Sequence, residues 1–350
     1  MNRVNFGIIG CGGAAVPVGE AISTSPLASL AMVHDVDLRL ARDFGESHRV
    51  PSTEDVNALL GDPGVQAVYI GVPHDLLAPL ARRALEAGKH VLVEKPMALT
   101  LADADALIAL AEAQRLALGV LYELRYAAPF LQARELIRAG AIGRINGVRI
   151  QTLIDKPEGY WRSGLSGRSV NPWRGQKARA GGGVVLMNTS HQFDAIAHLT
   201  GLEVVSVSAE VGTLVAPVEV EDMAAATLRY DNGAIGTLFA GAHLPGVEGG
   251  ERFDIYGTEG QLRLPDPYRN GSPSIFLRRE WQDIPAGVWR TLPALAVPVY
   301  ARAIEDFARA VQEGRPAPIG GCDARRVLAI VLAIYQSALE RRTIIWEARQ

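Results

Sequence analysis

The sequence predicts an α/β protein whose first domain is a doubly wound parallel sheet and whose second is an α+β domain with a large, mostly antiparallel, open-faced sheet. Its 350 residues exceed the roughly 100 to 150 residues of a typical single domain. Strand and helix patterns alternate through the first third of the chain, and from Arg144 onward short strands follow one another through hairpin turns. We therefore expect one domain over residues 1–121 and a second over residues 122–350.

In the first domain each buried strand is followed by a stretch with helical periodicity, which is typical of a parallel sheet with helices on both faces. The strands are expected at Val4–Ile9, Leu30–His34, Val65–Val72 and His90–Val93, and a last one begins at Val120. The helices are expected at Val18–Ser23, Leu38–Phe44, Leu76–Ala87 and Leu101–Gln114, with Asp37 as the N-cap of the second helix.

The second domain has the alternating apolar pattern of a half-buried antiparallel sheet. Its strands are expected at Asn146–Ile154, Val204–Leu214, Met223–Tyr230, Gly233–Ala240, Arg252–Tyr256 and Gln261–Leu264. Its helices are expected at Ala128–Ala139, Val185–Leu199, Pro298–Glu313 and Asp323–Arg341. These helices suffice to cover one face of the sheet, so we expect the other face to meet a second subunit in a homodimer or homotetramer.

Composition excludes several classes of protein. Hydrophobic residues make up 48% of the chain and charged residues 21%, which is ordinary globular usage and not that of a disordered chain. A formal net charge of -3 argues against nucleic acid as the main partner. Two cysteines cannot build a disulfide framework, and no apolar run has the length of a membrane span, so we expect a cytoplasmic protein that does not enter a membrane.

A glycine-rich turn follows the first predicted strand directly and opens a helix. Gly10-Cys11-Gly12-Gly13-Ala14-Ala15 matches the pattern G-x-G-x-x-A. In this pattern the first glycine makes the tight turn, the second lets the backbone approach a pyrophosphate, and the small last residue allows close helix packing. This context predicts a dinucleotide-binding loop; the competing interpretation is a merely tight turn.

An acidic residue stands where the second predicted strand ends. Asp35 comes 25 positions after Gly10, at the distance expected for a carboxylate that accepts bonds from the adenosine ribose hydroxyls and repels a 2'-phosphate. We therefore expect NAD to be preferred over NADP, although Arg39 and Arg42 lie within reach of a 2'-phosphate.

Glu94-Lys95-Pro96 follows the strand predicted at His90–Val93. Ligands of doubly wound sheets bind beyond the carboxyl ends of the strands, which predicts that Glu94 and Lys95, together with Val72 and Pro73 after the preceding strand, line the cofactor crevice. Pro96 restricts Lys95 to extended geometry and is a candidate for a cis bond. The alternative is a solvated lysine beside its own glutamate.

Four motifs together resemble the glucose-fructose oxidoreductase, inositol dehydrogenase and rhizopine catabolism (GFO/IDH/MocA) family. They are Gly-Ile-Ile-Gly-Cys-Gly at 7–12, Ala-Gly-Lys-His-Val-Leu-Val-Glu-Lys-Pro at 87–96, Gly181-Gly182-Gly183 ahead of Asn188 and His191, and Tyr-Gly-Thr-Glu-Gly at 256–260. The resemblance implies an amino-terminal Rossmann domain, a carboxy-terminal α+β domain, NAD(P)-dependent oxidation of a secondary alcohol on a sugar or cyclitol, and dimers or tetramers formed through the sheet.

The resemblance also implies site residues. Lys95 matches the catalytic and cofactor-orienting lysine, and His191 matches the histidine that exchanges the substrate proton. Helical spacing, not the resemblance, makes Asp194 a candidate to orient the ring of His191, and the alternative for His191 is a packed core residue. The family usually has an Asp one helical turn before that histidine. Here the position four residues before His191 is Met187, and the nearest polar residue is Asn188, three residues before it, which is a candidate substrate-binding residue. Two further segments depart from the family pattern. Where the family often has an Asn before an Arg-aromatic pair, this chain has Glu123-Leu124-Arg125-Tyr126, and Leu77 replaces a frequent histidine, with His74 nearby. Glu123 and Arg125 are candidate substrate-binding residues.

A long stretch without regular pattern, residues 155–180, is rich in aromatic and basic side chains. Loops of this length in a compact domain are usually functional. Trp161 and Trp173 offer apolar faces to a sugar ring, and Arg174 or Lys177 could bind its oxygens. Anchoring of the loop explains Trp161, Trp173 and Arg174 equally well. The same two interpretations, ligand binding and anchoring, apply to Arg162 and Arg168.

These observations predict an oxidoreductase that moves hydride between nicotinamide C4 and a carbinol carbon of a polyhydroxylated substrate. Lys95 and His191 are expected to converge on the reacting group, Lys95 stabilising charge on the oxygen and His191 exchanging the proton. The histidines are scattered, without metal-ligand spacing, so metal-free chemistry is expected. The alternatives are a non-catalytic NAD(P)-binding sensor of metabolite or redox state, and an NAD-dependent glycosidase that retains its cofactor.

Overall fold

The computed structural model describes residues 3–247, 250–267, 271–293, 295 and 297–346. The chain forms two compact units, each built from segments that are separated in the sequence. The first unit comprises Met1–Glu123, Glu158–Gly181 and Pro298–Leu328, and the second comprises Leu124–Pro157, Gly182–Val297 and Ala329–Gln350. The division after residue 121 stays a prediction.

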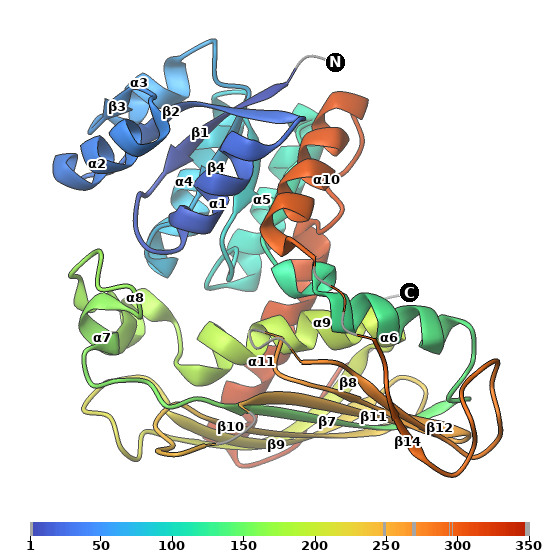
Figure 1. Cartoon of the computed structure of the whole chain (residues 1–350). Helices are drawn as coiled ribbons and strands as arrows, with labels where there is room; N and C mark the ends of the chain where they lie inside the picture. The colour runs from blue at the N-terminus through green and yellow to red at the C-terminus, as the bar shows by residue number, and fades with distance from the viewer. Residues whose placement is uncertain (1–2, 248–249, 268–270, 294, 296, 347–350) are drawn as a thin grey trace. The chain divides into compact units, whose positions relative to one another are not determined.

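The first unit contains a six-stranded parallel sheet in the order β3-β2-β1-β4-β5-β6 (Figure 1). Its strands are β1 (Val4–Ile9), β2 (Ala28–His34), β3 (Ser52–Thr53), β4 (Ala67–Ile70), β5 (His90–Val93) and β6 (Leu118–Val120). The strand order reverses between β1 and β4, and this switch point is where doubly wound sheets bind ligands. The predicted doubly wound parallel sheet is confirmed.

Helices flank this sheet, and α1 packs against α10 while α4 packs against α5. The helices of the first unit are α1 (Ala15–Thr24), α2 (Leu38–His48), α3 (Val56–Gly61), α4 (His74–Glu86), α5 (Leu101–Gln114), α7 (Tyr160–Ser163), α8 (Lys177–Ala180) and α10 (Val299–Glu313), and α11 (Gly321–Glu340) begins there. Asp37 caps α2 as predicted, since its carboxylate accepts from the backbone N–H groups of Arg39 at 3.0 Å and Leu40 at 3.4 Å.

Three local features differ from the prediction. The last strand, β6, ends at Val120 instead of beginning there, because the backbone turns into a short 3-10 helix at Glu123–Tyr126. The short β3 and α3 were not predicted, since a two-residue strand has no periodicity to detect. The stretch 155–180 contains short helical turns, at α7, α8 and the 3-10 helix Pro172–Gly175.

The second unit contains a nine-stranded sheet in the order β14-β13-β12-β11-β7-β10-β9-β8-β15. Its strands are β7 (Ile145–Leu153), β8 (Val204–Gly212), β9 (Met223–Tyr230), β10 (Ile235–Gly241), β11 (Glu251–Gly257), β12 (Gly260–Leu264), β13 (Ser274–Leu277), β14 (Trp289–Thr291) and β15 (Ile344–Ile345). Only β7 and β10 pair in parallel among the described strands of this sheet, which confirms a mostly antiparallel arrangement.

One face of this sheet is covered and the other is open. Side chains alternate between buried and exposed along β9 and β10, which is typical of a sheet with one solvated face. Figure 1 shows α6 (Ala128–Arg138) and α9 (Ser190–Thr200) along the same face. A π-helical turn at Val185–Thr189 leads into α9.

None of the helices in the described part of the chain combines the length and the apolar character that crossing a bilayer would take.

Candidate active site

The glycine loop joins β1 to α1 as predicted. Gly10 has a φ of 95°, and a Cβ at this position would collide with the carbonyl oxygen of Gly71, so only glycine fits the turn. The Gly10 N–H donates to the carbonyl oxygen of His34 at 2.8 Å, which ties the loop to the end of β2. The loop opens the 10-residue helix α1, where the first backbone N–H groups suit a phosphate.

Asp35 lies against this loop. Its Oδ2 accepts from the Cys11 backbone N–H at 2.8 Å, and its Oδ1 accepts from the Asp37 N–H at 2.9 Å. Arg39 extends to Asp37 instead, at 3.2 Å, as an exposed ion pair. The structure therefore brings the predicted phosphate loop and the predicted ribose-binding acid together.

Lys95 follows β5 at the carboxyl edge of the same sheet, and the Lys95–Pro96 bond is cis. The neighbouring Glu94 is not a solvated partner: its carboxylate accepts from Tyr69 Oη at 2.9 Å and from the Lys95 N–H at 3.3 Å. Burial raises the pKa of Glu94, although Lys95 acts in the opposite direction.

Burial also raises the pKa of Tyr300 well above its usual range, and Glu123 and Glu94 add to this shift. Glu123 thus lies in a buried group of carboxyl and phenol side chains.

Val72 and Pro73 follow β4 at the same edge, and His74 begins α4. His74 is buried, and its Nδ1 donates to the carbonyl oxygen of Ala180 at 2.8 Å, because a carbonyl can only accept. Burial, together with the nearby charges of Lys95 and Arg174, lowers the pKa of His74 to about 3. The imidazole therefore stays neutral beside two cations.

One aromatic side chain of the stretch 158–181, that of Trp173, packs against this histidine. The ring of Trp173 lies 4.5 Å from that of His74, and the Arg174 guanidinium lies 4.6 Å from the Trp173 ring. Trp161 packs edge-on against Tyr160 at 5.3 Å. Only 5% of Trp161 and 8% of Trp173 is exposed, which supports anchoring of the stretch. Stacking on a sugar stays a prediction for both.

In the second unit, the run of glycines before His191 has a steric cause. A Cβ at Gly183 would collide with the carbonyl oxygen of Glu221. The buried Glu221 carboxylate accepts from the N–H groups of Gly183 at 2.7 Å and Val185 at 3.0 Å, and from Tyr335 Oη at 2.8 Å. These bonds fix the start of the helical segment that carries Asn188 and His191.

Asn188 has a partner that the sequence analysis did not identify. Lys156, of which 3% is exposed, donates from Nζ to Asn188 Oδ1 at 2.7 Å. A lysine ammonium only donates, so Oδ1 of Asn188 faces Lys156 and its Nδ2 group faces away from it. Asn188 is half-buried and flanked by buried residues, and it stands three residues before His191 in the helical segment.

Asp194 forms a buried ion pair with Arg125, and its role in orienting His191 stays a prediction. Both of its carboxylate oxygens accept from Arg125, at 2.7 Å from Nε and 2.5 Å from Nη2, and the two side chains are 1% and 9% exposed. This buried pair holds the turn Glu123–Tyr126 to α9. A substrate contact by Arg125 stays a prediction.

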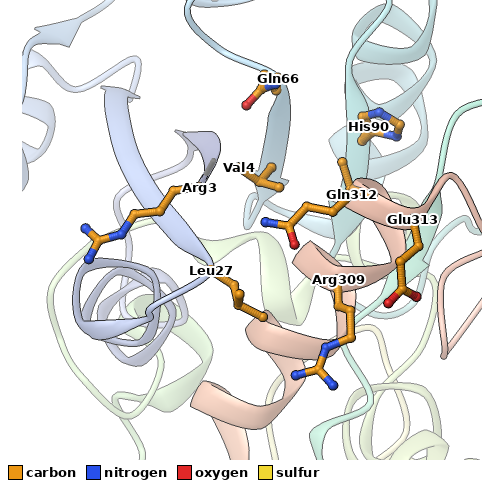
Figure 2. Close-up of a pocket in the computed structure, with 9 residues that line it drawn as sticks. Arg3, Val4, Leu27, Gln66, His90, Arg309, Gln312 and Glu313 are labelled. Atoms are coloured by element: carbon orange, nitrogen blue, oxygen red, sulfur yellow. The ribbon is translucent and has the colours of Figure 1, made fainter. Parts of the chain in front are cut away.

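A cavity of about 980 Å³ lies at the opposite edge of the first unit's sheet (Figure 2). It opens at the amino ends of β1 and β5, whereas the glycine loop and Lys95 follow their carboxyl ends. Its polar lining consists of Arg3, Gln66, His90, Arg309, Gln312 and Glu313. The cavity is therefore not part of the nucleotide edge.

Comparisons with known proteins agree with this arrangement. Residues 4–122 match the family described as an oxidoreductase family with an NAD-binding Rossmann fold, and residues 130–263 match the GFO/IDH/MocA C-terminal domain. Levoglucosan dehydrogenase of Pseudarthrobacter phenanthrenivorans is 29% identical over an alignment of 337 residues that covers 85% of this chain and 83% of the relative. Myo-inositol 2-dehydrogenase of Thermotoga maritima is 25% identical over 348 residues, with 97% and 98% covered.

Solved structures extend the comparison to bound ligands. The chain is similar to a levoglucosan dehydrogenase in complex with NADH, and to the same enzyme with NADH and levoglucosan, each with a TM-score of 0.88 at 26% identity. Both alignments cover 99% of this chain and 100% of the other. Because the amino-terminal and carboxy-terminal domains are both matched, and the likeness runs through nearly the whole length, this chain belongs to the GFO/IDH/MocA family of NAD(P)-dependent oxidoreductases.

Proposed function

We propose that this oxidoreductase acts on a secondary alcohol, or the corresponding carbonyl, of a ring-shaped polyhydroxylated substrate, and that Lys95 and His191 perform the chemistry. The observation that carries the proposal is the position of Lys95 at the carboxyl edge of the parallel sheet, the edge that also holds the glycine loop and Asp35. The relatives named above act on levoglucosan and myo-inositol, which supports a cyclic polyol or sugar as the substrate class.

The residues at this edge fit a dinucleotide. The glycine loop offers backbone N–H groups at the start of α1, and the carboxylate of Asp35 is held at the end of β2 by two backbone bonds. We assign the binding of NAD to Gly10–Ala15, Asp35, Val72, Pro73 and Glu94, and NAD is preferred over NADP because Asp35 repels a 2'-phosphate. Bound NAD(P) would supply the hydride acceptor or donor.

Lys95 donates to the reacting oxygen and stabilises its developing negative charge. An ammonium suits this role because it carries three donors and no acceptor. The neutral His74 supports it, since a charged imidazole at this place would compete with Lys95 for an anionic oxygen.

His191 accepts the hydroxyl proton in oxidation and returns it in reduction, the exchange for which an imidazole is best suited near neutral pH. Asn188 donates from Nδ2 to a substrate oxygen next to the reacting carbon. Lys156 is a positioning residue that holds the amide in this orientation.

The chain assembles with a second copy of itself through the open face of the sheet in the second unit, and it works in the cytoplasm. The free thiol of Cys322 is exposed, which suits a reducing compartment.

A substrate panel tests the proposal. Purified protein is mixed with NAD and with each of a set of inositols, aldoses, anhydrosugars and sugar acids, and NADH absorbance is followed. We expect turnover with at least one ring-shaped polyol or sugar. Nucleotide that copurifies with the protein, together with release of a glycoside's leaving group without net NADH formation, would instead show a glycosidase. Nucleotide binding without any turnover in either direction would favour a sensor.

A further inference from the structure

Two residues of the stretch 158–181 lie on the glycine loop, and the function proposed above uses neither of them. Arg168 Nε donates to the Cys11 carbonyl oxygen at 2.9 Å. A Cβ placed on Gly13 would collide with Ser166 Oγ, so the serine hydroxyl lies directly over that glycine. Both contacts lie within the first unit.

Cys11 is held by charged side chains on both of its backbone polar groups. Its N–H donates to Asp35, and its carbonyl accepts from Arg168. Burial and the charge of Asp35 raise the pKa of the Cys11 thiol to about 12, and Arg168 acts in the opposite direction, so both charges lie close to this residue. The Arg168 guanidinium also lies 5.8 Å from the ring of Phe44 in α2, the helix that follows Asp35.

Arg168 therefore lies between the glycine loop and the adenosine side of the nucleotide edge. The carbonyl of Cys11 uses its Nε–H, while the two Nη groups carry four more donors in a planar fork that matches phosphate oxygens. Arg168 is half-buried and Ser166 is exposed, so a ligand can reach both. A dinucleotide places its pyrophosphate on such a glycine loop.

We propose that Ser166 and Arg168 form a clasp over the glycine loop that binds the diphosphate of the cofactor, with Arg168 as the charged donor and Ser166 as a neutral one. The proposal rests on the nucleotide-binding role assigned to this loop. It gives the stretch 158–181 a second role, because the same stretch packs Trp173 against His74 beside Lys95.

Direct binding tests the clasp without any need for a substrate. NADH, NADPH and ADP-ribose are titrated into the wild type, Arg168→Ala, Arg168→Lys and Ser166→Ala. Arg162→Ala is the matched control, since Arg162 is an exposed arginine of the same stretch. We expect Arg168→Ala to raise the dissociation constants of all three ligands by about 10- to 100-fold, the effect of losing a hydrogen bond to a charged group. Arg168→Lys restores part of the affinity because the charge remains.

Ser166→Ala removes only an exposed hydroxyl, so this variant should fold even if Arg168→Ala does not. We expect Ser166→Ala to lower the affinity for all three ligands severalfold. The clasp is refuted if Arg168→Ala folds and binds ADP-ribose as the wild type does, or if Arg162→Ala loses as much affinity. A loss confined to NADPH would place Arg168 at the 2'-phosphate and would also refute it. A wild type that binds no NADH would overturn the cofactor assignment itself, which is a different result.

Discussion

Lys95 is the residue on which the proposed chemistry depends most directly. Replacing it by alanine removes one preorganised donor to the reacting oxygen, so we expect Lys95→Ala to lower kcat by about 10²-fold. The NADH dissociation constant should change little, because the glycine loop and Asp35 remain. Steady-state kinetics and an NADH titration on the same preparation measure both. A folded variant with an unchanged kcat would remove Lys95 from the mechanism.

Asn188 is expected to act on substrate binding. Asn188→Asp replaces an N–H donor by a carboxylate, which cannot donate and repels the lone pairs of a substrate oxygen. The new carboxylate can still pair with Lys156, so the fold should persist. We expect KM for the substrate to rise about tenfold, the effect of one lost hydrogen bond, with NADH binding unchanged. An unchanged KM would show that the Asn188 amide does not face the substrate.

His74 makes stability depend on pH. Its pKa is lowered from 6.5 to about 3 by burial, and by Lys95 and Arg174. Between these values the unfolded chain binds a proton that the folded chain excludes, so stability is lost as the pH falls from above 6.5. Lowering the pH from about 7 to about 5 should therefore reduce the unfolding free energy of both proteins, and we expect the reduction to be about 2 kcal/mol smaller for His74→Gln than for the wild type. Urea unfolding at both values measures this, and equal losses would contradict it.

At the level of single residues, the sequence predicted correctly those positions and contacts that are set by residues close in sequence. Asp37 caps α2 because the residues it bonds follow directly, and the glycine loop, Asp35 and Lys95 lie at strand ends that hydrophobic periodicity locates. Lys156 was missed because Asn188 lies 32 positions away. The contact between Arg168 and Cys11 spans 157 positions, and no local pattern encodes it.

The Arg125–Asp194 pair joins the turn Glu123–Tyr126 to α9, and both paired residues lie in the second unit. Removing one partner leaves a buried charge uncompensated, so we expect Arg125→Ala and Asp194→Ala each to lower the unfolding free energy by about 3–5 kcal/mol. The double variant should lose less than the sum of the two, because no lone charge remains. Denaturant unfolding of all four proteins measures the coupling. Strictly additive losses would show that the pair is not coupled.

Among the elements, length and regular periodicity decided what could be predicted. Helices such as α5 and α10 have apolar positions at helical spacing and were predicted within a few residues of their bounds. The strands β14 and β15 were missed because they have three and two residues, too few for alternation to appear, and the four-residue β13 was missed as well. The π-helical turn before α9 depends on the bonds that Glu221 accepts from Gly183 and Val185.

At the scale of the whole chain, the two units are assembled from alternating segments. The sequence predicted two domains in succession, because the alternation of strands and helices gives way near residue 144 to strands that follow one another. Glu158–Gly181 nevertheless belongs to the first unit, since Ser166 and Arg168 lie on the glycine loop and His74 bonds to Ala180. Such contacts form between segments more than 100 positions apart, which a pattern confined to a short window cannot reveal.

The open face of the nine-stranded sheet carries the last prediction, which concerns assembly. Along β10 the side chains of Ile235 and Phe239 are 50% and 48% exposed, and they point to the face opposite the buried positions of the same strand. Apolar side chains grouped on one sheet face are typical of a surface that another protein covers, and a second copy of the same chain presents a matching face. We expect the wild type to be a dimer or tetramer by light scattering at micromolar concentration. Phe239→Glu should shift it toward the monomer because the buried charge would lack a partner. Leu339→Glu is the matched control, since Leu339 is 84% exposed but lies on α11 and not on the sheet. A wild type that scatters as a monomer, or a control that dissociates as readily as Phe239→Glu, would rule out assembly through this face.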